Sequence, residues 1–238
     1  MNRVVNPDDP NLQRVELVAQ ALGELCEELV FVGGCAAGLL CTSPQAPPPR
    51  ATFDVDLVAE VAALAAYHAL EARFSERGFT RDMAQDAPIC RWRVRNVEVD
   101  LMPTNARVLG FSNRWYSLAM ATATPMALPS GARIRLISAP AFLATKFEAF
   151  ATRGGNDIMA SHDFEDIINV LDGRPGVETE IAGAGGELAA YLSERFRDVL
   201  RHPDFENALP GLVVFDDLYD NRIEAIRQRV TAIANLIF

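Results

Sequence analysis

The sequence contains no apolar stretch long enough to cross a membrane. Its hydrophobic runs, such as residues 61–70, are interrupted by polar residues well short of the roughly 18 consecutive apolar residues that a membrane helix needs. The first residues of the chain are polar and acidic, unlike a secretory signal segment. We therefore expect a cytoplasmic protein that makes no membrane contact.

Cysteine and histidine are also scarce. The four cysteines show neither the paired spacing of a zinc site nor the density of a secreted disulfide scaffold, so we expect reduced, partly buried thiols. A phosphohydrolase that holds its metal through several histidines is disfavoured, because the chain has only three histidines.

Positive charge is in short supply overall but unevenly distributed. The formal net charge is −10 at pH 7, which argues against broad, non-specific nucleic-acid binding. Between Arg91 and Arg153, however, nine basic residues stand against three acidic ones, a local charge of +6. This excess would favour a bound triphosphate, although arginines that alternate along strands can equally form a solvated sheet face.

Two acidic residues interrupt an apolar strand pattern at Asp54 and Asp56. Side chains alternate between the two faces of a strand, so these carboxylates point to one face. Phe53, Val55 and Leu57 are then expected to point into the core. Two carboxylates held this close repel each other unless a cation lies between them. A divalent ion that prefers oxygen ligands, Mg2+ or Mn2+, would neutralise them.

A third acid and a pair of glycines complete the pattern. Asp100 interrupts another alternating strand, which we predict forms a hairpin with residues 89–95 and lies beside the first two aspartates. Gly33 and Gly34 follow a short apolar strand at residues 28–32, at a point where the backbone must approach another group closely.

The combination of Gly33-Gly34, Asp54-x-Asp56 and Asp100 resembles the nucleotidyltransferase superfamily, whose members have the DNA polymerase β-like fold. The resemblance implies that the glycines let the backbone approach nucleotide phosphates. It also implies that the three carboxylates hold two Mg2+ (or Mn2+) ions at a bound NTP. Two such ions can activate an acceptor hydroxyl and neutralise the leaving pyrophosphate.

Two further stretches resemble motifs of the abortive-infection (AbiEii-like) nucleotidyltransferases. The first contains Lys146, the only lysine of the chain, followed by Arg153, and we predict that both bind the nucleotide. A helical lysine paired with nearby acids is the alternative. The second contains His162, Asp163 and Asp166. These residues either position the residues that bind the nucleotide or lie at the acceptor site. The alternative is that they form only an acidic helix start with a charge pair.

The predicted elements give an α+β protein. We expect a small mixed β-sheet nucleotidyltransferase core with helices packed on it at residues 1–138, followed by a helical region at residues 139–238. Apolar spacings of three and four predict one amphipathic helix over residues 12–29. In the second region, Gly154-Gly155 is expected to end one helix and Ser161 to cap the next.

The leading hypothesis is therefore a magnesium-dependent nucleotidyltransferase that transfers NMP from an NTP to an acceptor hydroxyl. The resemblance leaves the acceptor open among a tRNA end, a protein and a small molecule, and it implies that some relatives are toxins with a partner antitoxin. The alternative is a non-catalytic nucleotide- or partner-binding protein that keeps the fold.

Overall fold

The computed structural model describes residues 5–153 and 157–237. The chain forms two compact units. The sheet unit comprises Met1–Ala36 and Arg50–Ser138, and the helical unit comprises Ala37–Pro49 and Ala139–Phe238. Compactness does not show which segments fold independently, so the division into two domains at residues 138 and 139 remains a prediction.

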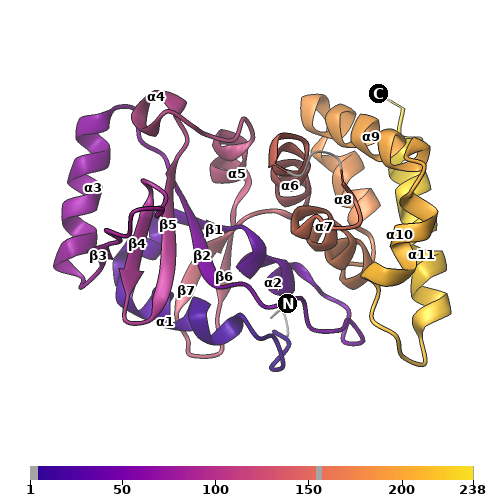
Figure 1. Ribbon diagram of the computed structural model, residues 1–238, viewed down its shortest axis with the longest axis horizontal. Helices are drawn as coiled ribbons and strands as arrows, with labels where there is room; N and C mark the ends of the chain where they lie inside the picture. The colour runs from indigo at the N-terminus through magenta and orange to yellow at the C-terminus, as the bar shows by residue number, and fades with distance from the viewer. Residues whose placement is uncertain (1–4, 154–156, 238) are drawn as a thin grey trace. The chain divides into compact units, whose positions relative to one another are not determined.

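The sheet unit is organised around a mixed sheet, as the sequence predicted. In the part of the chain that the structure describes, seven strands pair in the order β3-β4-β5-β2-β1-β7-β6 (Figure 1). The second strand, β2, lies between an antiparallel neighbour, β1, and a parallel one, β5. The strands are β1 (Leu29–Val32), β2 (Asp54–Ala59), β3 (Thr80–Arg81), β4 (Arg91–Val94), β5 (Val97–Pro103), β6 (Thr124–Ala127) and β7 (Arg133–Leu136).

Strand β1, in the interior of the sheet, is apolar on both faces. Every residue of β1 is buried, which is typical of a strand in the middle of a covered sheet. The hydroxyl of Tyr67, on α3 (Leu64–Glu76), donates to the carbonyl of Leu101 at 2.8 Å and ties that helix to β5. The short helices α4 (Ala106–Leu109) and α5 (Tyr116–Thr122) complete the unit.

The helix predicted over residues 12–29 is shorter than expected. Helix α1 spans Leu12–Leu22 and buries Val15, Val18 and Leu22. It ends because Gly23 has a φ of 56°, and the chain continues as a 3-10 segment, η1 (Gly23–Glu27), before entering β1. A glycine adopts this backbone conformation without the steric cost that a Cβ would add.

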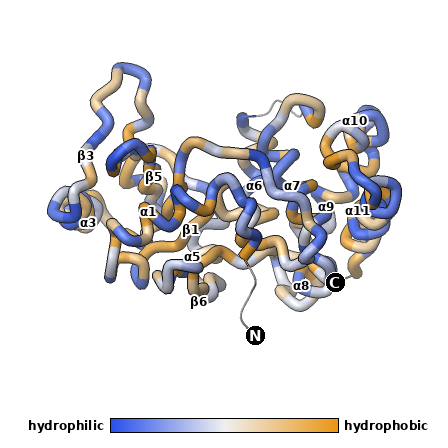
Figure 2. Tube along the Cα trace, turned by 90° about the horizontal axis from the view of Figure 1, so that it is seen from below, coloured by the Kyte–Doolittle hydropathy of each residue, from blue (hydrophilic) through white to orange (hydrophobic). Residues whose placement is uncertain are grey.

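The helical unit confirms the predicted helical second half. Figure 2 shows hydrophilic and hydrophobic residues interleaved along α11, as expected of a helix with one buried face. In the core, the rings of Phe147 and Phe196 meet edge to face at 4.9 Å. The helices are α2 (Ala37–Leu40), α6 (Ala139–Arg153), α7 (His162–Gly173), α8 (Val177–Ala184), α9 (Gly186–Arg201), α10 (Phe205–Leu212) and α11 (Tyr219–Ala234).

The predicted cap of α7 is confirmed, since the amide of Phe164 donates to the Ser161 hydroxyl at 3.2 Å. The predicted stop at Gly154-Gly155 lies outside the described residues, and α6 is described as far as Arg153. Across the described ranges, no helix is both long and apolar enough to span a bilayer.

The segment 37–49 is held against α7. The amides of Thr42 and Ser43 both donate to the carbonyl of Gly173, at 2.8 and 2.9 Å. The Arg174 guanidinium donates to the carbonyl of Leu40 at 2.6 Å. A Cβ at Gly173 would lie 2.3 Å from the Sγ of Cys41, so the close packing here requires a glycine.

Candidate metal centre

Three carboxylates converge on one face of the sheet. Asp56 on β2 pairs in parallel register with Asp100 on β5, and Asp54 lies two residues earlier on the same face. One oxygen from each of the three lies within 4.8 Å of the others. The alternation of side chains along two neighbouring strands thus brings the predicted acids together.

The opposite face of β2 packs into the hydrophobic core. Val55 and Leu57 are fully buried, as expected, but the prediction that Phe53 enters the core is wrong, because its side chain is 76% exposed. Phe53 precedes the first residue of β2, so the alternation of the strand does not hold it. Its ring lies instead 5.9 Å from the Arg14 guanidinium.

Gly33 packs against the carboxylate of Asp56. The residue has a φ of 68°, and an added Cβ would lie 1.7 Å from Oδ2 of Asp56. The close approach that the sequence predicted at the glycine pair is therefore made by an acid of the cluster itself. Gly34 is buried and begins a short 3-10 turn, η2 (Gly34–Ala36).

Arg91 contributes a positive charge to the cluster. Its Nε and Nη2 donate to the two oxygens of Asp100, both at 2.8 Å, and Nη2 lies 3.2 Å from Oδ2 of Asp54. Its Nη1 donates to Glu98 at 2.7 Å. Hydrogen bonding to Asp100, together with the charges of the neighbouring acids, raises the pKa of Arg91 above its usual range.

Sequence reasoning did not place Arg91 in the site, although a signal was present. The hairpin closes with Val94 opposite Val97, which puts Arg91 opposite Asp100 and Arg93 opposite Glu98. Arg93 in turn donates to Glu98 at 2.6 Å and to Asp82 at 2.8 Å. A two-residue turn in the predicted hairpin would have given this register.

The side chains of the cluster fit a divalent ion with a preference for oxygen. Its donors are carboxylate oxygens, which suit Mg2+ and Mn2+. Burial, and next the charge of Asp100, raises the pKa of Cys90 to about 12. Burial and then Asp56 likewise raise the pKa of Cys35, so both thiols stay protonated at neutral pH.

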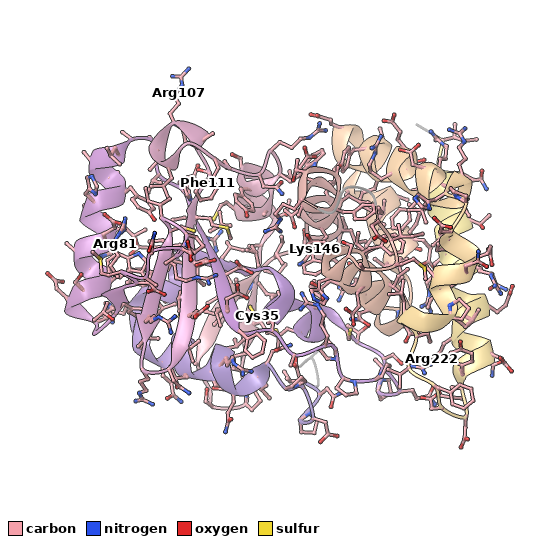
Figure 3. The ribbon with its side chains drawn as sticks, in the orientation of Figure 1. Cys35, Arg81, Arg107, Phe111, Lys146 and Arg222 are labelled. Atoms are coloured by element: carbon pink, nitrogen blue, oxygen red, sulfur yellow. The ribbon has the colours of Figure 1, made fainter. Side chains whose placement is uncertain are left out.

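The remaining predicted residues lie in the helical unit, where α6 and α7 bring a second cluster together. Lys146, labelled in Figure 3, projects from α6. Its Nζ lies 2.9 Å from Asp163 and 2.7 Å from Asp166. Arg153, which is 73% exposed, lies 3.3 Å from Asp163.

Burial and the neighbouring carboxylates have opposite effects on the pKa of Lys146. Burial alone would lower the pKa of Lys146, but the carboxylates of Asp166 and Asp163 outweigh it, and the pKa is raised. A spacing of four residues would bring His162 and Asp166 together on one helix face. The structure places the exposed His162 ring 3.3 Å from Glu165 instead, while Asp166 is fully buried beside Lys146.

Comparison with known proteins places the fold. No protein-family model matches this chain, and no curated protein matches it in sequence. Among solved structures, an antigenic nucleotidyltransferase-like protein from Paracoccidioides brasiliensis is similar, with a TM-score of 0.52 and 23% identity over 84% of this chain and 92% of that chain. JHP933 from Helicobacter pylori has a TM-score of 0.47 and 11% identity over 97% of this chain and 92% of that chain.

These observations establish the fold of the protein. This chain, a mixed sheet with helices packed on it and a helical C-terminal part, is similar in fold to the Paracoccidioides brasiliensis protein. This chain therefore has a nucleotidyltransferase-like fold.

Proposed function

We propose that this protein is a metal-dependent nucleotidyltransferase that transfers NMP from an NTP to an acceptor hydroxyl. The observation that carries the proposal is the convergence of Asp54, Asp56 and Asp100 within 4.8 Å on one face of a nucleotidyltransferase-like sheet. Three carboxylates this close favour a divalent cation, and the reaction needs positive charge at a triphosphate.

The three acids have distinct roles in this proposal. Asp54 and Asp56 would hold Mg2+ or Mn2+, and Asp100 would hold the ion on the acceptor side. Bound divalent ions supply charge neutralisation at the triphosphate and activation of the hydroxyl. Asp100 accepts the proton of the acceptor hydroxyl while the new bond from oxygen to the α-phosphorus forms and the bond to pyrophosphate breaks.

The glycines support the acids. Gly33 leaves room for the Asp56 carboxylate and so sets where that ligand lies. In this proposal the backbone at Gly33 and Gly34 approaches the nucleotide phosphates.

The second cluster has a proposed role in nucleotide binding. Lys146 and Arg153 are the proposed phosphate contacts, and Asp163 and Asp166 position them through the ion pairs described above. A phosphate contact by Lys146 exchanges one of its two carboxylate partners for a phosphate oxygen. His162 is exposed beside Glu165, and we assign it to the acceptor side of the reaction.

The acceptor and the biological role follow from the resemblance of the Lys146 and Asp163 stretches to AbiEii-like proteins. Candidate acceptors are a tRNA end, a protein hydroxyl and a small molecule, and the net charge of −10 favours a small acceptor over a large RNA. We include in this proposal a toxin role with a partner antitoxin.

One observation favours a second candidate function. The guanidinium of Arg91 already compensates Asp54 and Asp100. A cluster that its own arginine neutralises is also expected of a non-catalytic protein that binds a nucleotide or a partner through the same fold.

Calorimetric titration of each NTP in the presence of Mg2+ separates the two. The transferase proposal expects metal-dependent binding of at least one NTP, and loss of it in Asp54→Ala/Asp56→Ala. A matched control is Asp217→Ala/Asp220→Ala, which removes two charges from exposed positions of the helical unit and should bind as the wild type does. NTP binding that needs no metal and survives the first double substitution supports the non-catalytic function. The absence of all NTP binding contradicts the transferase proposal and the nucleotide-binding alternative, and leaves a protein that binds a partner through this fold.

A further inference from the structure

The β4–β5 hairpin places two arginines directly opposite two acids. Arg91 pairs with Asp100 and Arg93 pairs with Glu98 across the antiparallel strands. Since side chains of directly opposed residues lie on the same face of a sheet, all four project beside Asp54 and Asp56. The acid cluster thus has two arginines of the protein, Arg91 and Arg93, along its β4 side.

Arg91 engages the cluster in the way that a bound cation would. Its fork donates two parallel hydrogen bonds to Asp100, which is a strong geometry for a carboxylate. The same Nη2 reaches across β5 to Asp54 on β2, so one nitrogen bridges two of the three acids. The Arg91 side chain is only 18% exposed, so water screens these contacts weakly.

Glu98 gives Arg91 a second anchor outside the three acids. Nη1 of Arg91 lies 2.7 Å from Glu98, which Arg93 holds from the other side at 2.6 Å. Arg91 can therefore release Asp100 and Asp54 and still keep one carboxylate partner. Without such an anchor, release would leave a half-buried guanidinium unpaired, which is costly.

We propose that Arg91 is a built-in competitor for the metal: its guanidinium neutralises Asp54 and Asp100 in the metal-free protein and is displaced toward Glu98 when a divalent ion binds. This inference rests on the proposed function, because the competition is for the same carboxylates. It assigns Arg91 the task of keeping the acid cluster compact without metal, at the expense of metal affinity.

The test is calorimetric titration of MnCl2, without nucleotide, into the full-length wild type, Arg91→Gln and Arg93→Gln. Arg91→Gln is expected to bind Mn2+ about tenfold to a hundredfold more tightly, the range of a charge-assisted hydrogen-bonded pair. Arg93→Gln removes the same charge from the same strand face, where its bonds go to Glu98 and Asp82. It should change the affinity by less than about threefold, because more distant charges are largely screened.

A second variant guards against misfolding of the first. Arg91→Lys keeps the charge but cannot form two parallel hydrogen bonds to a carboxylate. It should bind Mn2+ more tightly than the wild type and less tightly than Arg91→Gln, with circular dichroism showing that each variant is folded.

The outcomes separate this inference from the proposed function. Mn2+ affinity that is unchanged or weaker in both Arg91 variants, yet lost in Asp54→Ala/Asp56→Ala, overturns the competition and leaves the metal site standing. No Mn2+ binding by any of these proteins overturns both. Equal tightening in the Arg91 and Arg93 variants also overturns the competition, since it would reflect net charge alone.

Discussion

Replacing Gly33 with alanine tests whether the acid cluster depends on a missing side chain at the end of β1. The added Cβ would lie 1.7 Å from Oδ2, 2.5 Å from Cγ and 2.7 Å from Cβ of Asp56. Rotation of the Asp56 side chain relieves the first two overlaps. It cannot relieve the third, because the Cβ position is fixed by strand β2, so the ends of β1 and β2 must also separate.

The expected effect has two parts. Alanine at a φ of 68° adds a backbone cost of about 1–2 kcal/mol. Overpacking against Asp56 adds typically about 1–3 kcal/mol more. The free energy of unfolding should therefore fall by about 2–5 kcal/mol. The Asp56 carboxylate should also leave its place beside Asp54 and Asp100, which predicts loss of Mn2+ binding.

Gly131→Ala is the matched control. Gly131 has a φ of 87° in the turn between β6 and β7, and an added Cβ would meet nothing within 4 Å. It therefore carries the backbone cost without the overlap. Urea denaturation followed by circular dichroism gives the free energy of unfolding of each variant, and calorimetry gives its Mn2+ affinity. Equal destabilisation of the two variants would refute the packing of Gly33 on Asp56.

Three further predictions concern the helical unit. Lys146→Met leaves the fully buried Asp166 without its cation and should lower the free energy of unfolding by about 3–5 kcal/mol, whereas Arg153→Met, at an exposed position, should cost less than about 1 kcal/mol. Equal losses in urea denaturation would contradict the buried pair. Because the pKa of Lys146 is raised in the folded protein, its contribution is complete below the unfolded lysine pKa and is lost as pH rises through the folded value. The stability gap between wild type and Lys146→Met should therefore shrink above about pH 10.4, and a constant gap across that range would count against the ion pairs. Gly173→Ala should lower the melting temperature, because the added Cβ overlaps the Cys41 Sγ. Adding Cys41→Ala to this variant should recover part of the loss, whereas Cys41→Ala in the wild type should not raise the melting temperature.

The positions of the three acids could be predicted because strand side chains alternate with a period of two. Asp54 and Asp56 share a face whatever the sheet order, and Asp100 joins them once β5 pairs with β2. The placement of Phe53 failed because alternation does not show at which residue a strand begins. The register of the β4–β5 hairpin was within reach of the sequence, yet only side-chain geometry shows that Arg91 turns toward Asp54 as well as Asp100.

The glycine pair illustrates what a sequence leaves undetermined. A glycine after an apolar strand predicts that something approaches closely, but the approaching group here comes from another strand. The β1–β2 register, with Val32 opposite Asp56, brings that carboxylate over Gly33.

The helix α10 was not predicted because it is short and contains Pro210, which is a poor residue for a helix interior.

The attachment of residues 37–49 to the helical unit has a consequence for synthesis on the ribosome. This segment emerges before most of the sheet unit and long before α7, whose Gly173 carbonyl holds Thr42 and Ser43. At typical translation rates the delay is on the order of ten seconds. During that time Leu39 and Leu40, which are buried in the finished protein, have no partner helix to cover them. The nascent chain therefore exposes a short apolar segment to chaperones for as long as the second half takes to arrive.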